Sequence, residues 1–258
     1  MNAPVTILNP GQRKPRLQYA YGRGTAYEEE LNLTAALEAL VPGNELRHPD
    51  QRTFQILHLI TEMAWVGIHD SLCTIDAALA CGDLIVVNHA FGRATLLAAM
   101  PTNCLRVLTD SLPQATFLAM RQMLADGASG LDSPGSRNLR KAGAEVWASF
   151  EAALAARGAS LDDLSRADND DLRMLASVMH AMHAFDSRIL EWRQSHLNLV
   201  WQLLGGHPTS AGHQQEQTPT SMRGRPITDL ERLAARPLFP LLWQHSTNVY
   251  RTASNGTY

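Results

Sequence analysis

The histidine near the end of the last long helical segment is the residue best placed for metal chemistry. At about 100° per residue, several apolar side chains share the azimuth of His196: Phe185, Ile189, Trp192, Val200 and Leu203. The imidazole therefore projects toward a helical interior, where each ring nitrogen needs a hydrogen-bond partner or a metal ion. A haem iron would accept one of them. On periodicity alone, a core histidine bonded to a backbone carbonyl is the more common arrangement.

A second candidate is Arg121, a charged residue in the otherwise apolar stretch FLAMRQML (117–124). An unpaired charge on such a segment is costly, so the guanidinium needs an anion. A planar guanidinium can bind a carboxylate through two parallel hydrogen bonds. The alternative is a structural ion pair with an acidic residue of another helix.

The elements expected to position these residues are almost all helices. Proline and glycine in the first 26 residues predict an irregular N-terminal arm (1–26), and the rest (27–258) is predicted to form one helical domain. The expected helices cover residues 27–40, from Asp50 to Cys81 or Gly82, 83–100 with its end at Pro101, 113–124, 139–157, 168–204, 227–236 and 238–246. A loop is expected at 125–137, and a longer polar loop after Gly206.

Composition excludes several classes of partner. The formal net charge is −3, which provides no basic footprint for nucleic acid. No continuous apolar stretch is long enough to predict a membrane span. The three cysteines form no metal-ligand spacing, so we expect reduced, packed thiols and a cytoplasmic protein.

Five short stretches together resemble the tryptophan 2,3-dioxygenase superfamily, whose members bind haem through a histidine. They occur in the family's order: ILHLITEMAW (56–65), PQATFLAMRQML (113–124), SGLDS (129–133), LEWRQSHLNLVWQLLGG (190–206) and PLFPLLW (237–243). Each is a weak signal alone, whereas five in the same order are a strong one. The resemblance spans roughly residue 27 to the C-terminus. It implies an all-α, single-domain helical bundle with haem b buried between long helices.

The resemblance also implies roles for particular residues. The axial ligand of the iron would be His196, which follows a Trp-Arg pair as in the family. The distal histidine would be His58, and the arginine that binds the substrate carboxylate would be Arg121. Phe117 stands where the family has a tyrosine, and we assign both Phe117 and Phe54 to substrate binding.

Departures from the dioxygenases favour a particular branch of the superfamily. The Gly/Thr/Ser loop that follows the axial helix in the dioxygenases is replaced by HPTSAGH (207–213), and the surroundings of the distal histidine differ. The chain is more similar to the bacterial haem-dependent L-tyrosine hydroxylases, which make 3,4-dihydroxyphenylalanine for antibiotic biosynthesis. We therefore expect a cytoplasmic tyrosine 3-hydroxylase that uses dioxygen or hydrogen peroxide and, like its family, forms a dimer or tetramer.

Three alternatives to the tyrosine hydroxylase stay open. The first is a haem dioxygenase acting on L-tryptophan or a substituted indole, which shares the carboxylate and amine of tyrosine. The second is a non-catalytic haem-binding protein, and the third is a helical bundle without a cofactor.

Hydroxylation beside a phenol also needs a group that accepts the phenolic proton. A neutral histidine suits this role because its ordinary pKa, about 6.5, lies near working pH. His58 and His89 are the two candidates. Arg93, one turn after His89, is assigned to a haem propionate, with a solvated side chain as the alternative. Trp192 is assigned to the haem edge, although core packing is the common role of such a residue.

Overall fold

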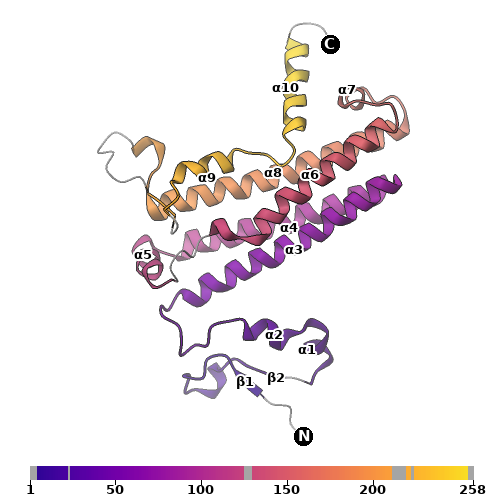
Figure 1. The fold of residues 1–258 in the computed structure, drawn as a ribbon. Helices are drawn as coiled ribbons and strands as arrows, with labels where there is room; N and C mark the ends of the chain where they lie inside the picture. Colours follow the sequence, from indigo (N-terminus) through magenta and orange to yellow (C-terminus); the bar gives the residue numbers. More distant parts are fainter. Residues whose placement is uncertain (1–4, 23, 125–129, 211–218, 222–223, 255–258) are drawn as a thin grey trace.

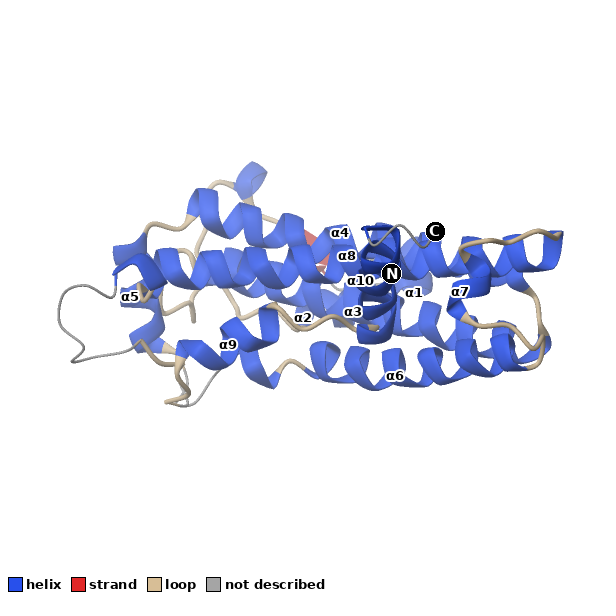
Figure 2. Cartoon of the chain, turned by 90° about the horizontal axis from the view of Figure 1, so that it is seen from above, coloured by secondary structure: helices blue, strands red, loops and turns tan. Residues whose placement is uncertain are grey.

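Four long helices form the body of the protein and lie side by side in the computed structural model (Figures 1 and 2). The structure describes residues 5–22, 24–124, 130–210, 219–221 and 224–254. The long helices are α3 (Gln51–Cys81), α4 (Leu84–Ser111), α6 (Pro134–Ala155) and α8 (Asp170–Leu204). This architecture confirms the predicted all-α class.

Shorter helices cap the two ends of the bundle. At one end lie α5 (Gln114–Met123) and α9 (Ile227–Ala234), and at the other lies α7 (Leu161–Leu164) (Figures 1 and 2). The last helix is α10 (Pro240–Ser254), which projects away from the long helices at a steep angle in Figure 1. By these bounds, all the residues predicted to do chemistry, His89 and Arg93 included, lie on the helices α3, α4, α5 and α8.

Local signals explain where the long helices begin and end. Gly82 ends α3 with a left-handed backbone (φ 78°), and the carboxylate of Asp83 then caps α4 by accepting from the backbone N–H of Val86 at 3.1 Å. Asn169 caps α8 in the same way, accepting from Leu172 N–H at 2.9 Å. Gly205 (φ 82°) ends α8. The chain therefore reverses sharply between α3 and α4, which pack as neighbours.

The prediction that α4 ends at Pro101 is wrong, because the helix continues to Ser111. Proline removes one helical hydrogen bond and strains the preceding turn, at a cost of about 3 kcal/mol. Buried side chains on both sides of the proline, including Ala98, Cys104 and Leu108, hold the helix together. Tertiary packing therefore outweighs the local signal.

The N-terminal region is more ordered than predicted. Residues 1–26 were expected to be irregular, but β1 (Val5–Ile7) pairs antiparallel with β2 (Ala20–Gly22), and Pro15–Leu17 forms a short 3-10 helix. The single helix expected over 27–40 is two helices, α1 (Ala26–Leu31) and α2 (Leu33–Glu38).

The break between α1 and α2 falls at Asn32, whose backbone is left-handed (φ 50°). Asparagine tolerates this conformation better than most residues. The buried carboxylate of Glu28 accepts from the backbone N–H of Thr34 at 3.4 Å, which supports the start of α2.

The helix α6 begins earlier than predicted. It starts at Pro134, after a 3-10 turn at Gly130–Asp132 and a cap in which Ser133 Oγ accepts from Ser136 N–H at 3.2 Å. The first part of the predicted loop (125–129) lies outside the described residues, as does Ser129 of the SGLDS stretch.

Two expectations drawn from composition need revision. By length and composition alone, α4 could cross a membrane, although 39% of its most apolar 18-residue segment is buried inside the protein. A buried core helix passes the same test, so this is weak evidence for a span.

Among the cysteines, Cys104 is buried as expected, whereas Cys73 and Cys81 are exposed.

A buried carboxylate fastens the C-terminal segment to α8. Asp186 is fully buried and accepts three hydrogen bonds, from Leu238 N–H (2.8 Å), Phe239 N–H (3.0 Å) and Trp243 Nε1–H (3.0 Å). Arg193 lies two turns further along α8, is also buried, and donates to the backbone carbonyl of Arg236. Together these contacts fix the chain that follows α9.

Candidate functional site

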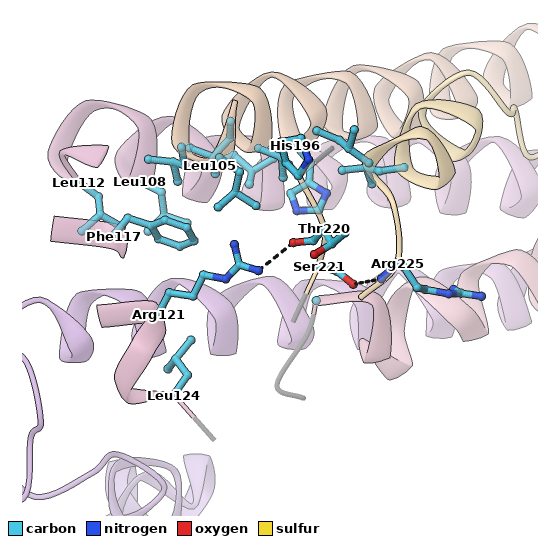
Figure 3. A pocket seen from close by; sticks show the side chains of 18 of the residues that line it. Leu105, Leu108, Leu112, Phe117, Arg121, Leu124, His196, Thr220, Ser221 and Arg225 are labelled. Atoms are coloured by element: carbon cyan, nitrogen blue, oxygen red, sulfur yellow. Dashed lines mark hydrogen bonds between the residues drawn. The ribbon is translucent and has the colours of Figure 1, made fainter. Parts of the chain in front are cut away.

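A large, mostly apolar cavity lies at the end of the bundle near α5 and α9, and we call it the main cavity (Figure 3). Its empty space is about 1130 Å³ when the open mouth is included. Its polar side chains include His58, Arg121 and His196. Its apolar wall comes mainly from α4 and α8: Leu105, Leu108, Leu112, Leu199, Val200, Leu203 and Leu204.

His196 projects from α8 into this cavity, as the apolar stripe of the sequence predicted. Burial and, to a smaller extent, the neighbouring charge of His58 lower the pKa of His196 to about 4. The imidazole is therefore neutral near pH 7. Within the described part of the chain, no hydrogen bond reaches either of its ring nitrogens. Trp192, one turn earlier, stacks on it with ring centroids 5.7 Å apart and planes 7° from parallel.

His58 enters the same cavity from α3. Its Nδ1–H donates to the backbone carbonyl of Phe54 at 2.7 Å. Because a carbonyl oxygen only accepts, Nδ1 carries the proton and Nε2 of the neutral ring is left as an acceptor. Burial lowers the pKa of His58, although the bond to Phe54 and the charge of Glu62 act in the opposite direction. The ring of Phe54 lies 4.0 Å from that of His58, so the two form one wall.

Arg121 and Phe117 reach the cavity from consecutive turns of α5. The Nη2 group of Arg121 donates to the backbone carbonyl of Thr220 at 2.8 Å, as Figure 3 shows. The start of α5 is held against the end of α8, where Gln114 Nε2 donates to Leu203 O at 3.3 Å. The half-buried guanidinium is therefore fixed at the rim of an apolar space.

The polar segment after α8 forms another part of the wall, through residues that the sequence analysis had not assigned to the site. Pro219, Thr220 and Ser221 line the main cavity together with Arg225. The backbone pairs across this turn, with Ser221 N–H donating to Arg225 O at 2.8 Å. Residues 211–218 and 222–223, and with them part of the predicted HPTSAGH stretch, lie outside the described residues. Only its position directly after the His196 helix hinted at this role.

A second, smaller recess borders His196, and we call it the arginine pocket. It shares His196, Gly130, Arg225 and Leu230 with the main cavity. Its remaining lining is Ser133, Ser136, Arg137 and Arg140 from the start of α6, Trp192 and Arg193 from α8, and Leu233 and Ala234 from α9. His196 therefore stands between an apolar space and a strongly basic one.

Two of the predicted site residues lie elsewhere. His89 and Arg93 are exposed on α4 and line neither recess beside His196. The Nε–H of Arg93 donates instead to Ser71 Oγ on α3 at 3.0 Å. The structure thus brings Phe54, His58, Phe117, Arg121 and His196 to one cavity, and Trp192 to its neighbour, but not this pair.

The residues around His196 fit a haem. A neutral imidazole is the form that binds a metal, and the nitrogens of this one have no other partner in the described structure. The described residues contain no cluster of three or more His, Cys, Asp or Glu side chains that could hold a bare metal ion. A metal on His196 would therefore bring most of its ligands with it, as iron in a porphyrin does.

Comparison of this chain with family models and with curated protein sequences gave no match. The resemblance to the tryptophan 2,3-dioxygenase superfamily accordingly stays a prediction that rests on the five stretches and on the geometry above.

Proposed function

We propose that this protein is a haem-dependent oxygenase that hydroxylates an aromatic amino acid, L-tyrosine, at ring position 3 to give 3,4-dihydroxyphenylalanine. The observation that carries the proposal is a single cavity in which His196, neutral and without a hydrogen-bond partner among the described residues, faces the same apolar space as His58 and Arg121. These groups supply an iron ligand, a proton acceptor and a carboxylate partner.

Each residue has a task that follows from its surroundings. His196 would hold the iron, and a bound haem would activate dioxygen or hydrogen peroxide beside the substrate. Arg121 would take the substrate carboxylate, because its guanidinium stands at the mouth of an apolar cavity where an ion pair is strengthened. Its existing bond to Thr220 O fixes the guanidinium before the substrate arrives.

His58 is suited to the phenol. Its Nδ1–H is occupied by the carbonyl of Phe54, so the free acceptor is Nε2, and its lowered pKa keeps the ring neutral near pH 7. Nε2 would accept the proton of the substrate hydroxyl as the ring is oxidised. The leucines of α4 and α8, together with Phe54 and Phe117, would enclose the ring and exclude water.

The net conversion adds one oxygen atom to tyrosine. With hydrogen peroxide, the second product is water. With dioxygen, the balance requires two electrons and two protons from an external reductant. The choice of tyrosine over an indole rests on the sequence departures after α8 and around His58.

The direct test is to express the chain with a haem supply and record its Soret band. The His196→Ala variant should lose the band, whereas His180→Ala, an exposed histidine on the same helix, should keep it. A Soret band that survives loss of His196, or a colourless protein after reconstitution with haem, would refute the proposal.

Product mass then identifies the reaction. Tyrosine and tryptophan are supplied separately, with peroxide or with dioxygen and a reductant. One oxygen added to tyrosine supports the proposal, and two added to an indole supports the dioxygenase alternative. Bound haem without turnover of any aromatic amino acid supports a haem-binding protein. Arg121→Gln should weaken substrate binding about 10-fold or more and leave the Soret band unchanged, with the exposed Arg188→Gln as its control.

A further inference from the structure

The arginine pocket carries positive charge without matching negative charge. Arg137, Arg140, Arg193 and Arg225 line it, and no aspartate or glutamate is among its described lining residues. Arg193 is buried, and burial first and then the charges of Arg140 and Arg236 lower its pKa, against the opposite effect of Asp186. Like charges gathered in a recess repel one another, so the arrangement favours an anionic ligand.

Three of these guanidinium groups are available to such a ligand. In the described residues, the guanidinium groups of Arg140 and Arg225 form no ion pair or hydrogen bond, and Arg137 donates to the backbone carbonyl of Asp132 at 3.2 Å. In Figure 3 the side chain of Arg225 points away from Arg121, and Arg225 lines both the main cavity and the arginine pocket. Ser133 and Ser136 add hydroxyl groups to the same pocket.

The position of the pocket beside His196 identifies the anion. A haem held by that imidazole is apolar over most of its area and carries two carboxylates on one edge. The main cavity provides leucine walls on one side of His196, and the arginine pocket provides cations on the other. We propose that Arg137, Arg140 and Arg225 bind the propionate carboxylates of the haem. This inference rests on the proposed function.

The inference also replaces a residue assigned from the sequence. Arg93 was expected to meet a propionate, but it is bonded to Ser71 and lines neither recess. Neither Arg137 nor Arg140 was considered for this role from the sequence, and Arg137 was placed at the end of the expected loop (125–137).

The test measures porphyrin affinity rather than turnover. Haem-free full-length protein is titrated with haemin and with haemin dimethyl ester, whose carboxylates are blocked, and binding is followed at the Soret band. The double variant Arg137→Gln/Arg140→Gln is compared with Lys141→Gln/Arg173→Gln, which removes the same charge from exposed positions outside the pocket.

The unaltered protein should bind haemin about 10-fold or more tightly than the ester. The pocket variant should lose most of this difference by binding haemin more weakly, while its affinity for the ester stays the same. The control variant should behave as the unaltered protein does.

Other results would overturn the inference. Equal affinity for haemin and the ester in the unaltered protein, or an unchanged ratio in the pocket variant, would show that the arginines do not hold the propionates. Phosphate is added in a separate arm. If phosphate binds through Arg137 and Arg140 while the ester binds as well as haemin, the pocket holds a free anion instead. Failure of both porphyrins to bind would refute the proposed function itself.

Discussion

Replacing Asp186 tests how strongly the C-terminal segment is held to the bundle. Its fully buried carboxylate accepts three hydrogen bonds at 2.8, 3.0 and 3.0 Å. In Asp186→Ala, these three donors lose their acceptor. One belongs to the fully buried Phe239, whereas Leu238 is half-buried and Trp243 is 37% exposed. Water can therefore reach two of the three donors in part.

At about 1–2 kcal/mol for each of the three donors left without its partner, the free energy of unfolding should fall by about 3–6 kcal/mol. Asp186→Asn should cost less, because one oxygen remains as an acceptor. The measurement is urea denaturation followed by circular dichroism. Asp171→Ala is the matched control on the same helix, since its side chain is 59% exposed and its ion pair with Arg157 is worth about 1 kcal/mol or less.

If Asp186→Ala and Asp171→Ala lowered stability equally, the buried carboxylate would not be the anchor. Unchanged protease resistance of the chain after residue 236 in Asp186→Ala would contradict the reasoning in the same way.

Four further predictions concern other parts of the molecule. In haem-free protein, the pKa of His196 is about 4 when folded and about 6.5 when unfolded, so the unfolded chain takes up the proton first as pH falls. Stability is then lost between about pH 6.5 and 4, by about 2–3 kcal/mol at pH 4.5, and urea melts of His196→Leu should lack this part of the loss. Gly135→Ala should destabilise by about 1–3 kcal/mol or more, because the new Cβ would lie 2.4 Å from Cβ of the buried Trp65. The Cβ added in Gly92→Ala meets nothing within 4 Å, so this variant should instead gain about 0.5–1 kcal/mol in the free energy of unfolding, measured as a higher melting temperature. Under the proposed function, His58→Gln should keep the Soret band and slow hydroxylation about 10²–10⁴-fold, and an unchanged rate would exclude its role as proton acceptor.

The helix boundaries that the sequence predicted well are those with a local cause. Gly82 and Gly205 adopt positive φ values that end α3 and α8. The sequence did not predict the boundaries that depend on tertiary packing. Pro101 stays within α4 because buried neighbours hold both halves of that helix, and periodicity does not report such contacts. The three-residue strands β1 and β2 are too short to produce an alternating pattern.

The candidate site was predictable in part for a similar reason. His196 shares an azimuth with residues that are now seen to be buried, including Phe185 and Ile189, so its direction followed from periodicity. His89 was a candidate because a neutral histidine suits the role of proton acceptor, and it shares a face of α4 with Ile85 and Leu96. That face points outward, since Ile85 is 62% and Leu96 76% exposed. An apolar stripe indicates that residues share a face, but it does not show what that face meets.

The anchoring of the C-terminal segment has a consequence for the order of events during synthesis. Asp186 meets Trp243, which lies 57 residues later in the chain. At about 5–20 residues per second, roughly 3–11 s separate the synthesis of the carboxylate from that of its last partner. During that interval α8 already carries its imidazole, but the anchor that fixes the chain beyond α9 does not yet exist. A ribosome-bound chain should therefore hold the segment beyond α9 loosely until Trp243 has been synthesised and has left the ribosome.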